Sequence, residues 1–312
     1  MFENFKSNIP SFALTLMGTL SSVPQNFKLK HSLSNGSGIN EPFFVVGCGR
    51  SGNTLLRKML VSGGDVSIPP ESYVLPRIVK YFLMYNYLPW NILSAGILNE
   101  FESYSEFHTW NINLEPALNK ARALEGTERT LENLLELVYM EYLKSQNPLA
   151  SKWGDKTPIN SLYINKIHKV FPGAKYVHML RDPRATTASY LKAGLKDSVE
   201  EAVTFWVNST NAIVSFKKRY PHLVTTIEYE DLVKNPEIQL NNVCRHLNVN
   251  FKESMLLYWK DDKSLGDTDK HPHHANTSKP ISLKNLDKWK EQLKMQEIRH
   301  IENRCKHLYR FS

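Results

Sequence analysis

The chain has 312 residues, of which 41% are hydrophobic and 22% charged, so wholesale disorder is excluded and one substantial core is expected. Its formal net charge of +8 favours an anionic partner, such as a nucleic acid, a membrane surface or a small phosphorylated ligand. The basic residues are scattered, and the sequence has no zinc-finger, RRM or basic-zipper pattern. We therefore expect no nucleic-acid partner.

The N-terminal residues 1–41 are predicted to form a partly flexible extension. Ser34, Asn35 and Gly36 begin a polar, glycine-containing stretch just before the first strong strand signal. The folded domain is predicted to occupy residues 42–312.

Three segments have the composition of buried strands, and a helix is predicted after each one. The pairs are strand 43–46 with helix 54–63, strand 174–180 with helix 185–194, and strand 223–229 with a helix from Asn235 or Pro236. Strands that alternate with helices predict an α/β fold, here a P-loop-like three-layer fold with a central parallel β-sheet flanked by helices. In such sheets ligands bind beyond the carboxyl ends of the strands.

Residues 77–143 are predicted to be mostly helical. They contain an aromatic-rich apolar run at 81–98, which Asn86, Pro89 and Asn91 interrupt, so no membrane-spanning helix is expected. The run is typical of two core or lid helices, and it also suits an apolar wall of an acceptor site.

The loop GCGRSG runs from Gly47 to Gly52 between the first strand and its helix. Backbone N–H groups in such a loop converge on an anion at a helix N-terminus. The spacing matches the nucleotide triphosphatase loop GxxxxGK(S/T), except that Asn53 stands where the lysine is needed. The cation is Arg50, inside the loop. We expect an anion site, although a purely structural turn is the alternative.

The pattern GxxRSGxTLL after a strand resembles the 5′-phosphosulfate loop of sulfotransferases that use PAPS (3′-phosphoadenosine 5′-phosphosulfate). Cytosolic members of that family have lysine at the position of Arg50, and the arginine form is similar to the tyrosylprotein and bacterial branches. The segment PESYVLPRI also resembles the tyrosylprotein enzymes, which place a glutamate, here Glu71, followed by two residues and then V(L/I)PRI. The resemblance implies the sulfotransferase fold and transfer of a sulfuryl group from PAPS to an acceptor hydroxyl.

A second signature, RDPRATTASY, resembles the 3′-phosphate motif of the same family, in which an arginine follows a strand and a serine stands eight residues later. Arg181 and Ser189 match that pattern. An arginine at a strand end and a hydroxyl two helical turns away can face one phosphate. By itself RDPR is equally typical of a salt-bridged surface turn.

Three looser matches extend the resemblance over residues 42 to 291. By this resemblance Lys156 reaches the sulfuryl region of the donor, Tyr229 approaches the nucleotide, and Lys288 is another donor contact. Arg50, Lys156 and the backbone amides of residues 51–54 would hold the phosphosulfate. Gly52 contributes one of these backbone amides, and the Ser51 and Thr54 hydroxyls and the Asn53 side-chain amide are added donors.

Sulfuryl transfer depends mainly on positioning and charge stabilisation, so neither a metal nor an Asp-rich metal site is expected. The acceptor hydroxyl needs a base, and Glu71 is the candidate, with helix capping as the alternative for that glutamate. His108 is the next base candidate, and His178 is expected to be a satisfied core histidine. Asp155 is expected to pair with a neighbouring charge.

Other readings of the sequence remain open. A P-loop kinase or nucleotide hydrolase would use ATP and magnesium, and a non-catalytic nucleotide-binding protein would bind the donor without turnover. The cluster HPHH at 271–274 is expected to be a loop near the donor pocket, with metal binding as the alternative. The acceptor is a small molecule, a lipid-like alcohol, a carbohydrate or a tyrosine.

The cysteines and the N-terminal residues bear on the compartment. Cys48, Cys244 and Cys305 are odd in number and widely spaced, which favours a reducing compartment over a disulfide scaffold. The apolar stretch 12–20 is preceded by a single lysine, Lys6, and so makes a poor signal peptide. We expect a cytoplasmic protein.

Overall fold

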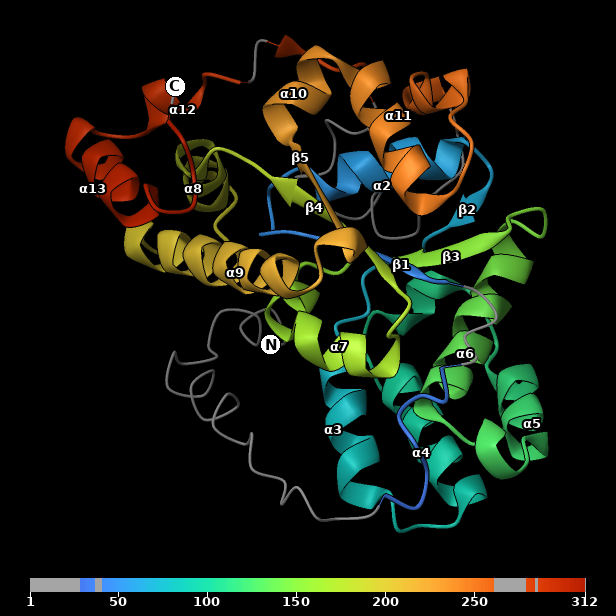
Figure 1. The fold of residues 1–312 in the computed structure, drawn as a ribbon. Helices are drawn as coiled ribbons and strands as arrows, with labels where there is room; N and C mark the ends of the chain where they lie inside the picture. Colours follow the sequence, from blue (N-terminus) through green and yellow to red (C-terminus); the bar gives the residue numbers. More distant parts are fainter. Residues whose placement is uncertain (1–28, 37–40, 261–278, 284–285, 312) are drawn as a thin grey trace.

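A five-stranded sheet lies at the centre of the protein, and its strands are all parallel, in the order β2-β3-β1-β4-β5 (Figure 1). The structure is a computed structural model that describes residues 29–36, 41–260, 279–283 and 286–311. The strands are β1 (Phe43–Val46), β2 (Val66–Ser67), β3 (Lys152–Asp155), β4 (Lys175–Leu180) and β5 (Val224–Glu228). The predicted α/β fold with a central parallel sheet is confirmed.

The middle strand, β1, has the sequence FFVV, and all four of its residues are buried. Such an uninterrupted apolar run is expected of a parallel strand that is covered on both faces. It pairs in register with both neighbours, Phe43 lying opposite Gly154 of β3 and Val46 opposite His178 of β4. The three predicted strands are confirmed to within one residue at each end. Strands β2 and β3 were not predicted.

Helices cover both faces of the sheet, which makes three layers (Figure 1). One face packs mainly against α2 and α11, and the other against α3 to α7 and α9. The helices are α2 (Asn53–Ser62), α3 (Leu75–Tyr85), α4 (Trp90–Glu102), α5 (Glu115–Ala123), α6 (Leu131–Gln146), α7 (Ile164–Val170), α8 (Pro183–Lys192), α9 (Val199–Arg219), α10 (Tyr229–Lys234), α11 (Pro236–Leu247), α12 (Trp289–Gln292) and α13 (Met295–Cys305). Helices α12 and α13 form a third apolar cluster with α8 and α9 at one end of the molecule.

The aromatic run 81–98 is divided between α3 and α4, with a turn before Trp90. Phe82, Leu93 and Ile97 are completely buried in the largest apolar cluster, so the prediction of core helices is confirmed. None of the helices in the described ranges combines the length and the hydropathy of a bilayer-spanning segment. The apolar acceptor wall stays a prediction.

Part of the predicted N-terminal extension is described and packs on the helical layer. The backbone N–H of His31 donates to Asn86 Oδ1 at 2.9 Å, and Ser32 forms a parallel bridge with Thr130. The Ser34 hydroxyl donates to the Glu132 carboxylate at the start of α6. Residues 1–28 and 37–40 lie outside the described residues, so the boundary at residue 42 stays a prediction.

Candidate active site at the carboxyl ends of the strands

Each of the five strands is followed by one of the residues predicted to act on the donor or the acceptor. Taken in the order of the sheet, these residues are Glu71 after β2, Lys156 after β3, Arg50 after β1, Arg181 after β4 and Tyr229 after β5. Because all strands are parallel, their carboxyl ends lie at one edge of the sheet. Direct contacts join Glu71 to Lys156, Arg50 to Arg181, and Arg181 to Tyr229.

The loop between β1 and α2 is held in shape by its own polar groups, by α8 and by the 3-10 helix η4 (Pro158–Tyr163). The Asn53 side-chain amide donates to the carbonyl of Cys48 at 3.0 Å, so the residue in the place of the Walker lysine braces the loop. Ser161, in the 3-10 helix Pro158–Tyr163, accepts from the Gly47 N–H at 2.9 Å and donates to its carbonyl at 3.1 Å. Ser161 was not predicted. It stands 114 residues from Gly47 in the sequence, and only the fold brings the two together.

Two residues of the loop have backbone conformations in the left-handed region, Arg50 with φ 67° and Gly52 with φ 93°. At Gly52 a glycine is also required sterically, since a Cβ there would lie 2.4 Å from Cδ2 of Tyr229. The loop therefore fits closely against the start of α10.

Arg50 and Arg181 bring two guanidinium groups to the loop. Arg50 Nε donates to the Ser189 hydroxyl at 3.2 Å, and Arg181 Nη1 donates to the Arg50 carbonyl at 2.8 Å. The Arg181 guanidinium also stacks on the Tyr229 ring, 4.4 Å from its centre. Burial, and then the charge of Arg181, lower the pKa of Arg50. A bound anion would relieve both effects, so the pair favours a phosphate or sulfate group.

Lys156 joins the loop to Glu71. Its side chain is completely buried, and its Nζ contacts the Thr54 hydroxyl at 3.3 Å and forms an ion pair with Glu71 Oε1. The other carboxylate oxygen of Glu71 accepts from the Tyr73 hydroxyl at 2.5 Å. The Glu71 side chain is 17% exposed, so it is open to a small reactant. The structure thus brings the predicted base and a predicted donor cation into one cluster.

Arg57 fastens the segment that leads to Glu71. It is completely buried on α2, and its Nε and Nη2 both donate to the carbonyl of Ile68, at 3.1 and 2.9 Å. The helix that follows the loop therefore also positions the base candidate. Arg57 was not predicted, because an arginine inside a helix gives no sign of its partner.

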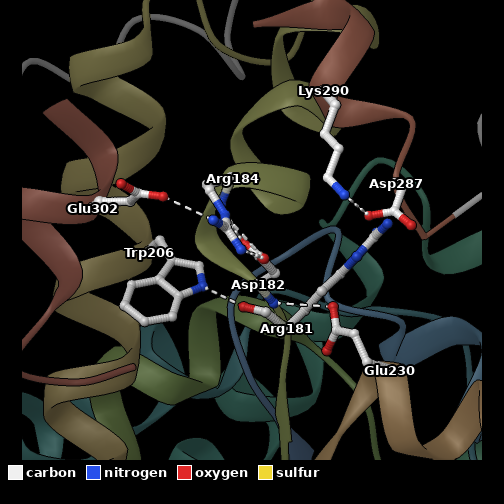
Figure 2. A network of polar contacts seen from close by, with 8 residues as sticks. All are labelled: Arg181, Asp182, Arg184, Trp206, Glu230, Asp287, Lys290 and Glu302. Atoms are coloured by element: carbon white, nitrogen blue, oxygen red, sulfur yellow. Dashed lines mark hydrogen bonds and ion pairs between the residues drawn. The ribbon is translucent and has the colours of Figure 1, made fainter. Parts of the chain in front are cut away.

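The two arginines of RDPR have different roles (Figure 2). Arg181 faces the loop and Tyr229, whereas Arg184 forms ion pairs with Asp182, at 2.6 Å, and with Glu302 of α13, at 2.7 Å. The Arg184 guanidinium also lies 4.1 Å from the centre of the Trp289 ring. The salt-bridged interpretation therefore holds for Arg184, and anion binding by Arg181 stays a prediction.

Other candidates lie apart from this row or outside the described residues. Lys288 is exposed just before α12, and no hydrogen bond or ion pair of the described ranges links it to the loop. His108 is exposed, with its Nδ1 3.0 Å from the Ser105 carbonyl oxygen. The HPHH cluster lies outside the described residues.

Two expectations about single residues need correction. The Asp155 side chain accepts hydrogen bonds from Tyr139, at 2.8 Å, and Asn160, at 2.7 Å, so its direct partners are neutral groups and not a charge. It is 1% exposed, and a buried carboxylate depends on such donors. His178 is buried in β4 as expected, but its Nε2 has no hydrogen-bond partner within the described residues.

Two buried polar atoms of the site lack a hydrogen-bond partner among the described residues, and a bound donor anion would supply one. Ser51 Oγ and Arg181 Nε are buried and have no partner among the described residues. Buried polar groups are nearly always hydrogen-bonded, so each such atom calls for a ligand or a water. Both belong to residues predicted to contact the phosphates of PAPS. The donor set of guanidinium, ammonium and hydroxyl groups suits an oxyanion.

Comparisons with known proteins agree with this geometry. Residues 42–253 match the family model described as the Sulfotransferase family. Protein-tyrosine sulfotransferase 1 of Danio rerio is 23% identical over 288 residues, covering 86% of this chain and 73% of that protein. Omega-hydroxy-beta-dihydromenaquinone-9 sulfotransferase Stf3 of Mycobacterium tuberculosis is 25% identical over 263 residues, covering 69% and 64% respectively.

One solved structure with a related fold is the sulfotransferase domain from the Synechococcus PCC 7002 olefin synthase. It is 21% identical, has a TM-score of 0.56, and the match covers 88% of this chain and 96% of that domain. The resemblance inferred from the motifs and the predicted fold class are both confirmed.

Proposed function

The chain belongs to the sulfotransferase family, and from that membership we propose that it transfers the sulfuryl group of PAPS to an acceptor hydroxyl and releases PAP (3′-phosphoadenosine 5′-phosphate). One observation carries the proposal. Two separate cationic sites meet at one loop, Lys156 on one side and Arg181 on the other, with Arg50 between them. A donor with a phosphosulfate and a separate 3′-phosphate needs such a pair of sites.

Each group has a proposed role in the donor complex. Arg50, Lys156 and the loop amides hold the phosphosulfate, and the Ser51 and Thr54 hydroxyls add donors. Arg181 and Ser189 hold the 3′-phosphate, while the Tyr229 ring borders the nucleotide. Arg50 already contacts Ser189 at 3.2 Å, so the two anion sites share a boundary.

In the proposed reaction the acceptor oxygen attacks sulfur, and the bond from sulfur to the phosphate oxygen breaks. Negative charge grows on the leaving phosphate, and Arg50 and Lys156 stabilise it. The acceptor proton passes to the Glu71 carboxylate. Lys156 contacts Glu71 and the loop residue Thr54, so it holds the base beside the group being transferred.

The capping alternative for Glu71 has less support than the role of base. Helix α3 begins at Leu75 behind the N-cap residue Val74, and no side chain caps it. The carboxylate of Glu71 is instead directed at Lys156 and Tyr73. A carboxylate in that place suits proton transfer better than helix capping.

We propose an apolar alcohol or phenol as the acceptor. Beside Glu71, Tyr73 is 42% exposed as a residue, and its ring centre lies 6.4 Å from that of Tyr104. Arg77, the next cation along α3, is already paired with Glu100. An aromatic surface with a neutralised cation favours an uncharged acceptor over an acidic one. The two relatives named above carry names with different acceptors, a protein tyrosine and a menaquinone derivative.

A thermal-shift assay tests the donor. PAP without metal should raise the melting temperature, whereas stabilisation only by ATP with Mg²⁺ would contradict the proposal and favour a kinase or hydrolase. Radiolabelled PAPS is then offered with 2-naphthol, 1-dodecanol, a monosaccharide or a tyrosine peptide. Transfer to either of the first two supports the apolar acceptor, and transfer only to the peptide or the sugar contradicts it.

The base is tested with Glu71→Gln, using Glu102→Gln at the exposed end of α4 as the control. We expect at least about a hundredfold loss of kcat in the first variant and no loss in the second. Full activity of Glu71→Gln would remove the proposed base and leave the family assignment intact.

We also propose a reducing compartment such as the cytoplasm. The three cysteines Cys48, Cys244 and Cys305 are buried free thiols, as expected of a protein that does not rely on disulfides. Fractionation of cells that express a tagged full chain tests this placement.

A further inference from the structure

We propose that Tyr73 is a positioning residue for the base Glu71, holding the carboxylate in the orientation that meets the acceptor. The inference rests on the proposed role of Glu71. Two observations of geometry support it: the backbone conformation of Tyr73 and the way in which the carboxylate is held.

The backbone of Tyr73 is in the left-handed region, with φ 55°. Four non-glycine residues of the described ranges have positive φ, and two of them, Asn111 and Asn248, are asparagines at helix C-caps, where this conformation is common. The other two are Arg50 and Tyr73, and both lie in the candidate site. A bulky side chain in this region is strained, and such strain concentrates at functional sites.

The hydrogen bond of Tyr73 gives a reason for that conformation. Its hydroxyl donates to Glu71 Oε2 at 2.5 Å, while Lys156 contacts Oε1. The carboxylate is thus held at both oxygens, each by a different residue. A glycine or an asparagine would make the same backbone turn with less strain, but neither could reach Glu71 in this way.

A contact at each carboxylate oxygen matters because Glu71 is partly exposed. Without the Tyr73 hydroxyl the carboxylate loses its contact at Oε2 and gains freedom to rotate about its side-chain bonds. With Tyr73 in place it keeps one orientation, and proton transfer requires the base to be within hydrogen-bond reach of the acceptor hydroxyl. Tyr73 as a whole residue is 42% exposed, whereas burial is the main cause that raises the pKa of its hydroxyl, so the hydroxyl that bonds Glu71 is shielded from water.

The test uses Tyr73→Phe, which removes the hydroxyl and keeps the ring, with Tyr220→Phe as the control. Tyr220 is half-buried between α9 and the start of β5, so it lies at the edge of the sheet opposite the site. In Tyr73→Phe we expect kcat to fall about tenfold, the loss typical of one hydrogen bond to a charged group. The KM for PAPS, the affinity for PAP and the melting temperature should stay as in the parent protein. Tyr220→Phe should change none of these quantities, nor kcat.

A double-mutant cycle separates positioning from general damage. In the Glu71→Gln background the Tyr73→Phe change should cause no further loss, because its effect passes through the carboxylate. An equal loss in both backgrounds, or a fall in PAP affinity together with kcat, would overturn the inference.

Crystal structures of the PAP complexes provide a readout that needs no acceptor. In Tyr73→Phe the Glu71 carboxylate should move or take more than one position, and an unchanged carboxylate would refute the role of Tyr73. If the parent protein sulfates none of the acceptors offered, the proposed function fails, while this structural comparison still decides the question of Tyr73.

Discussion

Lys156 contacts the carboxylate of Glu71, although 85 residues separate the two in the sequence. They meet because β2 and β3 are neighbours in the sheet and end at the same edge. The contact unites a donor cation and the base candidate, so one substitution should affect both binding and chemistry.

Replacing Lys156 with methionine should abolish most activity and also destabilise the protein. The lysine side chain is completely buried and that of Glu71 is 17% exposed, so the variant leaves a carboxylate without its cation. Loss of one partner of a buried pair lowers the free energy of unfolding by about 3–5 kcal/mol. Because Glu71 is partly exposed, we expect a decrease of about 3 kcal/mol. Urea denaturation measures this change.

The control for Lys156 is Lys120→Met, which removes a lysine paired with Glu141 on the surface. It should change the free energy of unfolding by less than about 1 kcal/mol and leave activity intact. Equal effects of the two substitutions on stability and activity would contradict the predicted role of Lys156 as a donor cation paired with the base.

Gly52→Ala should damage the donor loop. A Cβ there would lie 2.4 Å from Tyr229 Cδ2, and the residue has φ 93°. We expect a loss of about 1–3 kcal/mol from backbone strain, and at least a tenfold loss of PAP affinity as the loop shifts. Calorimetric titration with PAP measures the second effect. Gly173→Ala is the matched control, because a Cβ at that position meets nothing within 4 Å.

Arg184→Lys should loosen the C-terminal helix α13 from the rest of the protein (Figure 2). Lysine keeps the charge but loses the planar group that bonds Asp182 and Glu302 and stacks on Trp289. The loss should be about 2 kcal/mol, with faster amide hydrogen exchange in α13. On the same helix, Arg304→Lys alters an exposed pair with Glu200 and should leave exchange unchanged. Equal exchange in all three proteins would show that Arg184 does not hold the helix.

His178 should make the protein sensitive to acid. Burial lowers its pKa from 6.5 to about 3, so the folded protein keeps this histidine neutral while the unfolded chain takes up a proton below pH 6.5. The contribution of neutral His178 to the free energy of unfolding is therefore complete above pH 6.5 and is lost as the pH falls toward about 3. Over that range the free energy of unfolding falls by at most about 1.4 kcal/mol per pH unit.

Unfolding free energies measured between pH 7 and about pH 5 test this expectation. The His178→Gln variant should show a flatter pH dependence than the parent protein. The exposed His222 provides the control, and His222→Gln should follow the parent curve. A parallel curve for His178→Gln would disprove the assignment.

Local sequence by itself determined the parts of the fold and the site that depend on neighbouring residues. Apolar or β-branched residues mark β1, β4 and β5 as strands, and the glycine spacing from Gly47 to Gly52 predicts an anion loop. The spacing of Arg181 and Ser189, on a strand end and on the next helix, predicts that both face one phosphate, and in the fold Ser189 contacts Arg50 of the loop. These features are short-range, so the pattern of residue types is enough to predict them.

Only the tertiary structure decided what depends on the order of the strands. Strand β2 has two residues, and β3 has the half-polar sequence KWGD, so neither has a pattern of its own, and both exist because they pair with their neighbours. Their places in the sheet bring Glu71 to Lys156. Likewise, Ser161 reaches Gly47, and Tyr73 reaches Glu71 through a backbone conformation that no residue pattern predicts. Contacts between distant segments follow from the packing of the whole chain, and for that reason they could not be read from the motifs.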